Sequence, residues 1–356
     1  MDTEQRAFLD DLLARSTPSG FESDGQRRWL EYVEPHADEI RVDAYGNAVA
    51  VSEGRDGAPT IAVAGHGDEI GLMVRDVTDD GFLKLSRIGG SDRTVTRGQH
   101  VTVHTGDGSV PGVIGQVAIH LRDPSKEEYD DITEQHVDIG VEDGETAEAL
   151  VDVGDPVTLR TRVSDLDDER LAARGMDNRV GIWTAAEAFR RAVDTDPGAT
   201  VCAVSTVQEE VGLKGAEMVG FDLDPDAVVA VDVTHATDGP SSPGDKGSDI
   251  ELGGGPVVAR GSANHPKLVE ALRTVGSEEG IDVQLAAAGT HTGTDADTFY
   301  TAGGGTPALN LGIPNRYMHT PVEVVDLDDL EASVELLAAF LADAGEFTPF
   351  ESGILR

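Results

Sequence analysis

Cysteine, lysine and aromatic residues are scarce in this chain, and each scarcity has a consequence. The one cysteine, Cys202, leaves no partner for an intrachain disulfide, and its place in an apolar run argues against a reactive thiol. Lysine occurs only five times, and lysine plus arginine total 27 against 67 acidic residues. Because phosphate contacts need a basic face, the formal net charge of −40 excludes nucleic acid as an ordinary partner.

Long apolar runs are absent as well. No run approaches the ~20 residues that a membrane-spanning helix needs, so we expect no membrane partner. The first residues, MDTEQRAFLDDLL, are acidic and amphipathic and lack the basic start and apolar core of a secretory signal. We therefore expect a cytoplasmic protein.

The acidic residues are spread through the chain and do not form one tail. Such a surface repels itself at low ionic strength, and molar salt screens the repulsion. We interpret this composition as adaptation to a salt-rich cytoplasm, as in haloarchaea. Recruitment of basic partners is the alternative, which the dispersed charge does not favour.

Both ends of the chain alternate between helix and strand patterns. The helix patterns are Thr3–Ala14, Gln26–Val33, Val180–Val193, Pro266–Ser277 and Leu327–Asp343. The apolar strand patterns lie at 60–66, 200–208, 227–233, 283–288 and 307–312. This alternation predicts an α/β fold with a mostly parallel, twisted sheet flanked by helices.

The segment 69–163 has a different character, with short strand patterns and frequent glycines. The strand patterns are 70–77, 82–88, 100–105, 113–117, 137–141 and 156–161, and short helices fit only near 125–129 and 145–150. They predict a small β-barrel-like domain inserted into a discontinuous α/β domain of residues 1–68 and 164–356. A separate binding module is the alternative for the insert.

The most informative segment is Thr200–Val211, TVCAVSTVQEEV, a buried-strand pattern that ends in Glu209 and Glu210. Open α/β sheets place their active sites where strands leave the sheet. Neighbouring side chains on extended backbone point in different directions, so we expect the two glutamates to have different roles.

Other candidate residues stand at the ends of other predicted strands or just before a predicted helix. In chain order they are His66, Asp68, Asp177, Asp232 and His319. Each alone is ordinarily a cap or a surface residue. Their joint placement is hard to obtain by accident, so we expect them to converge on the two glutamates.

These imidazole and carboxylate groups fit two divalent metal ions, zinc or cobalt. Two ions roughly 3.5–4 Å apart need a bridging carboxylate and further ligands on each. Asp177 serves as the bridge. His66 and Asp232 are then the further ligands of the first ion. Glu210 and His319 are the further ligands of the second ion.

Two acidic residues remain after this assignment. Asp68 is close enough in sequence to orient His66 through its second ring nitrogen. Glu209 is left as a general base for metal-bound water.

At these residues the chain resembles the tetrahedral, self-compartmentalising metallo-aminopeptidases, which include glutamyl and leucyl aminopeptidases. The matching segments are AGHGDEIGLMV (64–74), RGMDNRVG (174–181), VQEEVGLKGA (207–216), VDVT (231–234), GTDAD (293–297) and IPNRYMHTPVEVV (313–325). They occur in the family's order and span most of the chain. Gly67 departs from the larger apolar residue of many relatives.

The resemblance implies the same five metal ligands, the same roles for Asp68 and Glu209, and a position of His291 and Thr294 near the substrate cleft. It also implies a metal-dependent aminopeptidase that acts on short peptides. In the family the insert serves subunit association and the chains form tetrahedral dodecamers, so we expect a homo-oligomer of this kind.

Three other functions are open at this point. A co-catalytic metal amidohydrolase that deacylates N-acyl amino acids would use a similar site. A glycosidase needs two carboxylates roughly 5–9.5 Å apart, which adjacent glutamates provide poorly. A non-catalytic assembly protein predicts missing ligands. The sequence leaves open the preferred N-terminal residue, the physiological metal, and the roles of His235 and His120.

Overall fold

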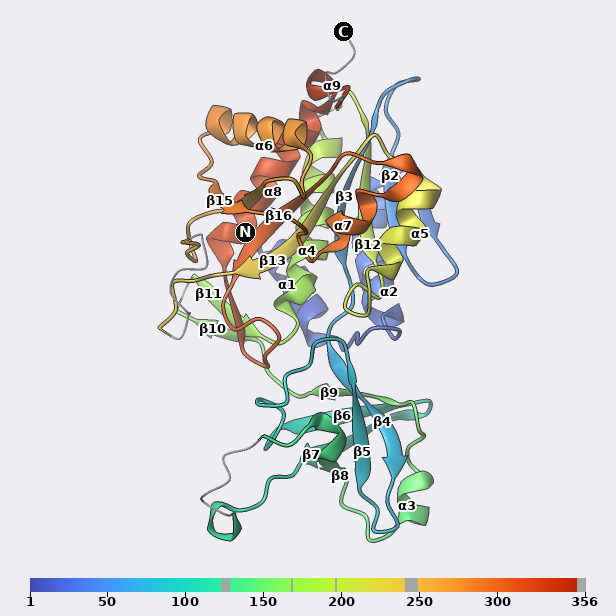
Figure 1. The fold of residues 1–356 in the computed structure, drawn as a ribbon. Helices are drawn as coiled ribbons and strands as arrows, with labels where there is room; N and C mark the ends of the chain where they lie inside the picture. The colour runs from blue at the N-terminus through green and yellow to red at the C-terminus, as the bar shows by residue number, and fades with distance from the viewer. Residues whose placement is uncertain (123–128, 168, 196, 241–248, 351–356) are drawn as a thin grey trace.

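The protein consists of an α/β body and a small β-barrel attached to one end of it (Figure 1). This computed structural model describes residues 1–356 except 123–128, 168, 196, 241–248 and 351–356. Within the described residues, no helix combines the length and apolar character needed to cross a bilayer.

An eight-stranded mixed sheet forms the centre of the α/β body. In spatial order its strands are β1 (Glu39–Val42), β2 (Ala48–Ser52), β12 (Thr200–Thr206), β3 (Thr60–His66), β13 (Ala227–His235), β16 (Ala308–Asn315), β14 (Val257–Arg260) and β15 (Gln284–Ala287). The strands from β12 to β16 run parallel, whereas antiparallel pairs occur towards both edges. Apolar sequences buried on both faces, such as that of β3, are typical of central parallel strands.

Helices cover both faces of this sheet. The larger core contains residues of α1 (Thr3–Ala14), α2 (Ser23–Val33), α4 (Met176–Val193), α6 (Pro266–Glu279), α8 (Leu327–Ala342) and α9 (Ala344–Phe347). The opposite core contains residues of α5 (Lys214–Leu223) and α7 (Asp295–Phe299). Successive residues of β13 alternate between the two cores, since Val229 belongs to the first and Val228 to the second.

A second, three-stranded sheet lies at the edge of the α/β body. It consists of β10 (Ser164–Leu166), β11 (Arg170–Ala173) and β17 (Glu323–Asp326), all antiparallel. The chain enters α4 directly from β11 and enters α8 directly from β17. This small sheet therefore fixes where two segments distant in sequence begin.

The barrel closes in the order β4-β5-β8-β7-β6-β9 and has its own apolar core. Its strands are β4 (Gly71–Val77), β5 (Leu83–Ile88), β6 (His100–Thr105), β7 (Gly108–Ile114), β8 (His136–Asp138) and β9 (Pro156–Leu159), and its helix is α3 (Gly144–Glu148). Two single 3₁₀ turns, η2 (Ile119–Leu121) and η3 (Ile132–Glu134), lie in the same segment as the barrel. Two others, η1 (Glu34–His36) and η4 (Ala302–Gly304), lie in the α/β body. All six barrel strands lie within residues 69–163.

The predicted α/β fold with an inserted barrel is confirmed, and the differences are local. The strand predicted at 113–117 is wrong, because β7 runs from Gly108 to Ile114 and pairs with β6 through a tight turn. The strand predicted at 137–141 is shorter than expected, and most of the helix predicted near 125–129 lies outside the described residues. Edge strands such as β1 were missed because most of their side chains are exposed and carry no apolar pattern.

Candidate metal centre

Three neighbouring parallel strands bring candidate residues to one edge of the large sheet. His66 is the last residue of β3 and pairs in register with Thr206, the last residue of β12. Glu209 and Glu210 follow three and four residues after Thr206. Asp232 lies near the end of β13, on the other side of β3. The apolar runs that predict these strands therefore also place the four polar side chains together.

Segments next to the small sheet supply the other two residues. Asp177 is the second residue of α4, where the backbone is not yet helical (φ −72°, ψ 103°). His319 lies in the loop between β16 and β17. Because β11 and β17 pair with each other, the segment that leads into Asp177 and the segment that follows His319 are held side by side.

Asp177 lies between the two histidines. Its Oδ1 is 3.1 Å from His66 Nε2, and its Oδ2 is 3.2 Å from His319 Nε2. Asp232 Oδ1 lies 3.6 Å from the same His66 nitrogen, and Glu210 Oε1 lies 3.4 Å from the same His319 nitrogen. Each histidine thus faces Asp177 and at least one further carboxylate.

The donor atoms form two groups whose members all lie within 4.8 Å of one another. One group is His66, Glu209 and Asp232, and the other is Asp177, Glu210 and His319. Imidazole nitrogen with carboxylate oxygen is the donor set that zinc and cobalt take, so the residues fit divalent ions. Glu209 was predicted as a base and not as a ligand, yet it belongs to the first group, and its Oε2 lies 3.8 Å from His66 Nε2.

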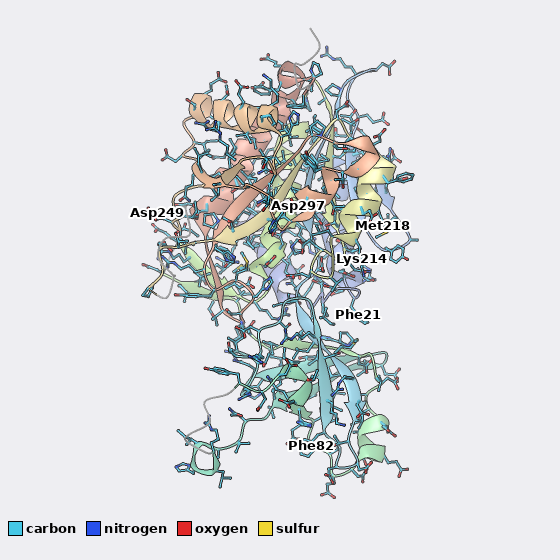
Figure 2. All side chains as sticks on the ribbon, in the orientation of Figure 1. Phe21, Phe82, Lys214, Met218, Asp249 and Asp297 are labelled. Atoms are coloured by element: carbon cyan, nitrogen blue, oxygen red, sulfur yellow. The ribbon has the colours of Figure 1, made fainter. Side chains whose placement is uncertain are left out.

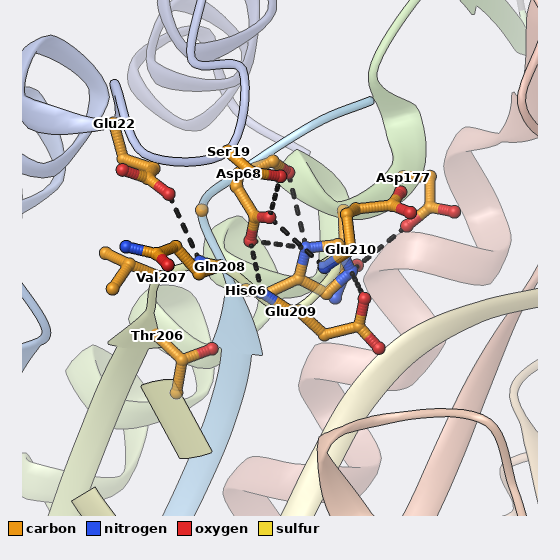
Figure 3. A network of polar contacts seen from close by, with 12 residues as sticks. Ser19, Glu22, His66, Asp68, Asp177, Thr206, Val207, Gln208, Glu209 and Glu210 are labelled. Carbon is orange, nitrogen blue, oxygen red and sulfur yellow. Dashed lines mark hydrogen bonds and ion pairs between the residues drawn. The ribbon is translucent and has the colours of Figure 1, made fainter. Parts of the chain in front are cut away.

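Asp68 is fully buried and connects β3 to the turn after β12 (Figure 3). Its Oδ1 lies 3.3 Å from His66 Nδ1 and accepts a hydrogen bond from the Glu209 N–H at 3.0 Å. Its Oδ2 accepts from the Glu210 N–H at 3.2 Å and from Ser19 Oγ at 2.6 Å. A carboxylate only accepts, so Asp68 favours a proton on His66 Nδ1, and Nε2 is the ring nitrogen that could give up its proton and bind a metal ion.

The segment that carries the two glutamates is braced by a further acid. Glu22 Oε1 accepts a hydrogen bond from the Gln208 N–H at 3.1 Å, as Figure 3 shows. Gln208 has a φ of +56°, a left-handed conformation that is unusual for a residue other than glycine. Glu22 and Asp68 together hold three consecutive backbone N–H groups of this turn.

The buried carboxylates of the cluster need a positive charge beside them. Burial raises the pKa of Glu209 to about 10 and that of Glu210 to about 7. Hydrogen bonds to Asp177 and Glu210 raise the pKa of His319 to about 11. Burial alone would lower the pKa of His66, yet nearby carboxylates raise it well above its usual value. Buried acidic groups of this kind need a compensating positive charge, which protons or metal ions can supply.

The two groups open into a cavity of about 300 Å³. Its further described lining residues are uncharged or histidine: Val233, Thr234, His235, Thr292, Gly293, Thr294, Asn310 and Met318. Asp297, which lies in the α/β body (Figure 2), fixes one wall of the cavity. Its carboxylate accepts hydrogen bonds from the Thr292 and Gly293 N–H groups, both at 2.9 Å. Of the two residues expected near the cleft, Thr294 lines this cavity and His291 does not.

Sequence reasoning missed several buried acids around the site. Glu69 pairs with Arg174 and with Arg179, the latter at 2.6 Å, and so ties the end of β3 to the start of α4. Glu323 accepts hydrogen bonds from two backbone N–H groups of the site. In the sequence, Glu69 stands out as a second acid directly after Asp68. Glu323 stands out as the lone charged residue in the apolar run VEVV.

Comparison with known proteins gives matches over nearly the whole chain. The M42 glutamyl aminopeptidase family matches residues 46–336. The lysyl aminopeptidase of Pyrococcus furiosus is 34% identical over 341 residues, which cover 93% of this chain and 95% of the relative.

Solved structures are similar over the same extent. An aminopeptidase from the archaeon Desulfurococcus kamchatkensis has a TM-score of 0.92 and 32% identity, with 99% of each chain covered. The TET1 peptidase of Pyrococcus horikoshii, described as assembling into a tetrahedron or a large octahedral shell, has a TM-score of 0.85 and 30% identity. That match covers 95% of this chain and 99% of the other.

Proposed function

This chain belongs to the M42 glutamyl aminopeptidase family and is a metal-dependent aminopeptidase, and we propose that it uses two divalent metal ions to release N-terminal residues from short peptides. The observation that carries the two-metal proposal is the position of Asp177 between His66 and His319. One carboxylate with an oxygen directed at each histidine is suited to bridge two ions.

The proposed ligands follow from the distances around Asp177. The first ion, zinc or cobalt, would bind to His66 and Asp232. The second would bind to Glu210 and His319, and Asp177 would bridge the two. When bound, such ions lower the pKa of a water molecule and stabilise the oxyanion of a tetrahedral intermediate.

Glu209 is the proposed general base. Its carboxylate lies beside the His66 group and lines the cavity, where a peptide carbonyl and a water molecule would meet. Glu209 takes a proton from the attacking water and returns it to the departing amine. Asp68 assists by holding the Glu209 backbone and the His66 ring.

The cavity wall bears on the preferred substrate. No lysine or arginine occurs among the described residues that line it, so an acidic substrate side chain would lose its water there without gaining a lysine or arginine partner. We propose that neutral or basic N-terminal residues are preferred over acidic ones, although the family is named for glutamyl substrates.

Assembly and environment are further proposals. We propose that residues 1–68 and 164–356 form the catalytic domain and that the insert 69–163 serves association into a homo-oligomer. The Pyrococcus horikoshii relative is described as assembling into a tetrahedron or a large octahedral shell, and its tetrahedral form supports a tetrahedral dodecamer here. The net charge of −40 supports a halophilic, haloarchaeal protein, and a cytoplasmic location stays a prediction.

A panel of aminoacyl chromogenic amides tests the proposed function. The substrates carry free neutral, basic or acidic N-terminal residues, and each has an N-acetylated counterpart. We expect metal-dependent release from the free-amine substrates, with acidic residues cleaved most slowly. Activity confined to the acetylated substrates would indicate a deacylase, and acidic residues cleaved fastest would contradict the proposed preference.

A further inference from the structure

A buried glutamate outside the proposed ligand set holds the backbone of two proposed ligands. Glu323 Oε2 accepts a hydrogen bond from the Asp177 N–H at 2.9 Å, and Glu323 Oε1 accepts from the His319 N–H at 3.1 Å. The Glu323 side chain is 2% exposed, and none of the ion pairs between described residues includes it. Oε2 also accepts a long hydrogen bond from Asn315 Nδ2 at 3.5 Å. Each carboxylate oxygen therefore holds one backbone N–H group of the site.

The small sheet explains this position. Glu323 is the first residue of β17 and pairs in register with Ala173, the last residue of β11. The chain reaches Asp177 four residues after Ala173, and His319 lies four residues before Glu323. Glu323 thus stands where these two segments meet.

The backbone at both ligands is irregular, so it gains little support from secondary structure. His319 has a φ of +61° and Tyr317 a φ of +64°, in the left-handed region that residues other than glycine seldom adopt. Their loop is closed at its base by hydrogen bonds between Arg316 and Val324, at 2.9 and 3.0 Å. The Asp177 N–H belongs to the first turn of α4, where helical partners are missing.

We propose that Glu323 is a positioning residue that sets the spacing of Asp177 and His319 and thereby the affinity for one of the two metal ions. This inference rests on the two-metal site proposed above. Asp68 holds the glutamates contributed by the large sheet, whereas Glu323 holds the pair contributed by the small sheet. Residues that orient metal ligands typically change metal affinity by about 10–100-fold when they are replaced.

Calorimetric titration of Zn²⁺ into metal-stripped protein in molar KCl tests this inference. Glu323→Gln keeps the size of the side chain but leaves one acceptor oxygen for two N–H groups. We expect the wild type to bind two ions and Glu323→Gln to bind one of them about 10–100-fold more weakly.

A matched control separates positioning from general destabilisation. Asp326 is a buried acid on the same strand, and it caps α8 by accepting a hydrogen bond from the Asp328 N–H at 3.1 Å. Asp326→Asn should lower the melting temperature and still bind both ions with wild-type affinity.

The possible results are distinguishable. If the wild type binds two ions and Glu323→Gln binds both as tightly as Asp326→Asn does, the inference is overturned and the two-metal proposal stands. If the wild type binds fewer than two ions, the two-metal proposal itself fails. Should Glu323→Gln not fold, Glu323→Asp keeps the charge but is too short to reach both N–H groups. The same weakening is expected of it, and wild-type affinity would overturn the inference.

Discussion

The carboxylate of Asp68 accepts a hydrogen bond from the backbone N–H of Glu209 at 3.0 Å, across 141 positions of sequence. The same carboxylate lies 3.3 Å from His66 Nδ1 and accepts from the Glu210 N–H. A single buried acid therefore fixes a proposed ligand, the proposed base and a second ligand relative to one another. From the sequence, only the contact of Asp68 with His66 was expected.

Replacing Asp68 should affect metal binding and turnover together. Asp68→Asn leaves one acceptor oxygen where the wild type has two, so we expect metal affinity to fall about 10–100-fold, with a loss of kcat. Asp43 is a suitable control, because its carboxylate likewise accepts hydrogen bonds from backbone N–H groups, those of Tyr45, Gly46 and Asn47. Asp43→Asn should lower only the melting temperature. Equal metal affinity in the two variants would count against the proposed role of Asp68.

Replacing Glu209 should remove the general base and leave the metal ions in place. We expect Glu209→Gln to lower kcat by about 10²–10⁴-fold, the usual contribution of a general base, while metal analysis still finds two ions per chain. Glu217→Gln, an exposed change on the neighbouring helix α5, serves as the control with wild-type activity. Loss of one ion in Glu209→Gln would instead make Glu209 a ligand, as its proximity to His66 and Asp232 allows.

The metal-free protein should lose stability as the pH rises. Burial raises the pKa of Glu209 from 4.5 to about 10, and hydrogen bonds to Asp177 and Glu210 raise that of His319 from 6.5 to about 11. At pH 7–10 the folded chain therefore holds protons that the unfolded chain has released, and stability falls with increasing pH.

Thermal unfolding at a series of pH values, with and without bound metal, measures this effect. The melting temperature of chelator-treated protein should fall between pH 7 and pH 10. With metal bound the fall should be smaller, because the ions take the place of the protons. Equal slopes for the two forms would contradict the prediction.

Salt should stabilise the protein through its charge. With a net charge of −40, mutual repulsion of surface carboxylates weakens as the Debye length falls from about 10 Å at 0.1 M salt to about 3 Å at 1 M. We expect the melting temperature and the oligomer fraction, measured by light scattering, to rise with KCl concentration. Sucrose at equal osmolality is the control. A melting temperature independent of KCl would argue against the halophilic interpretation.

The part of the site that lies on the large sheet could be predicted from the sequence, and the part on the small sheet only partly. Apolar runs mark β3, β12 and β13, and the side chains at their ends follow from parallel pairing. The position of Asp177 beside His319 depends on the pairing of β11 with β17, which joins Arg170 to Asp326 across 156 positions. Short strands paired over such a distance leave no local pattern, so the contacts of Glu323 could not be predicted, although its lone charge in an apolar run marks the position.

Anomalous X-ray diffraction at the zinc edge, from crystals grown with Zn²⁺, tests the two-metal proposal most directly. We expect two peaks roughly 3.5–4 Å apart with the Asp177 carboxylate between them. One peak should lie beside His66 and the other beside His319. A single peak, or two peaks that Asp177 does not bridge, would contradict it.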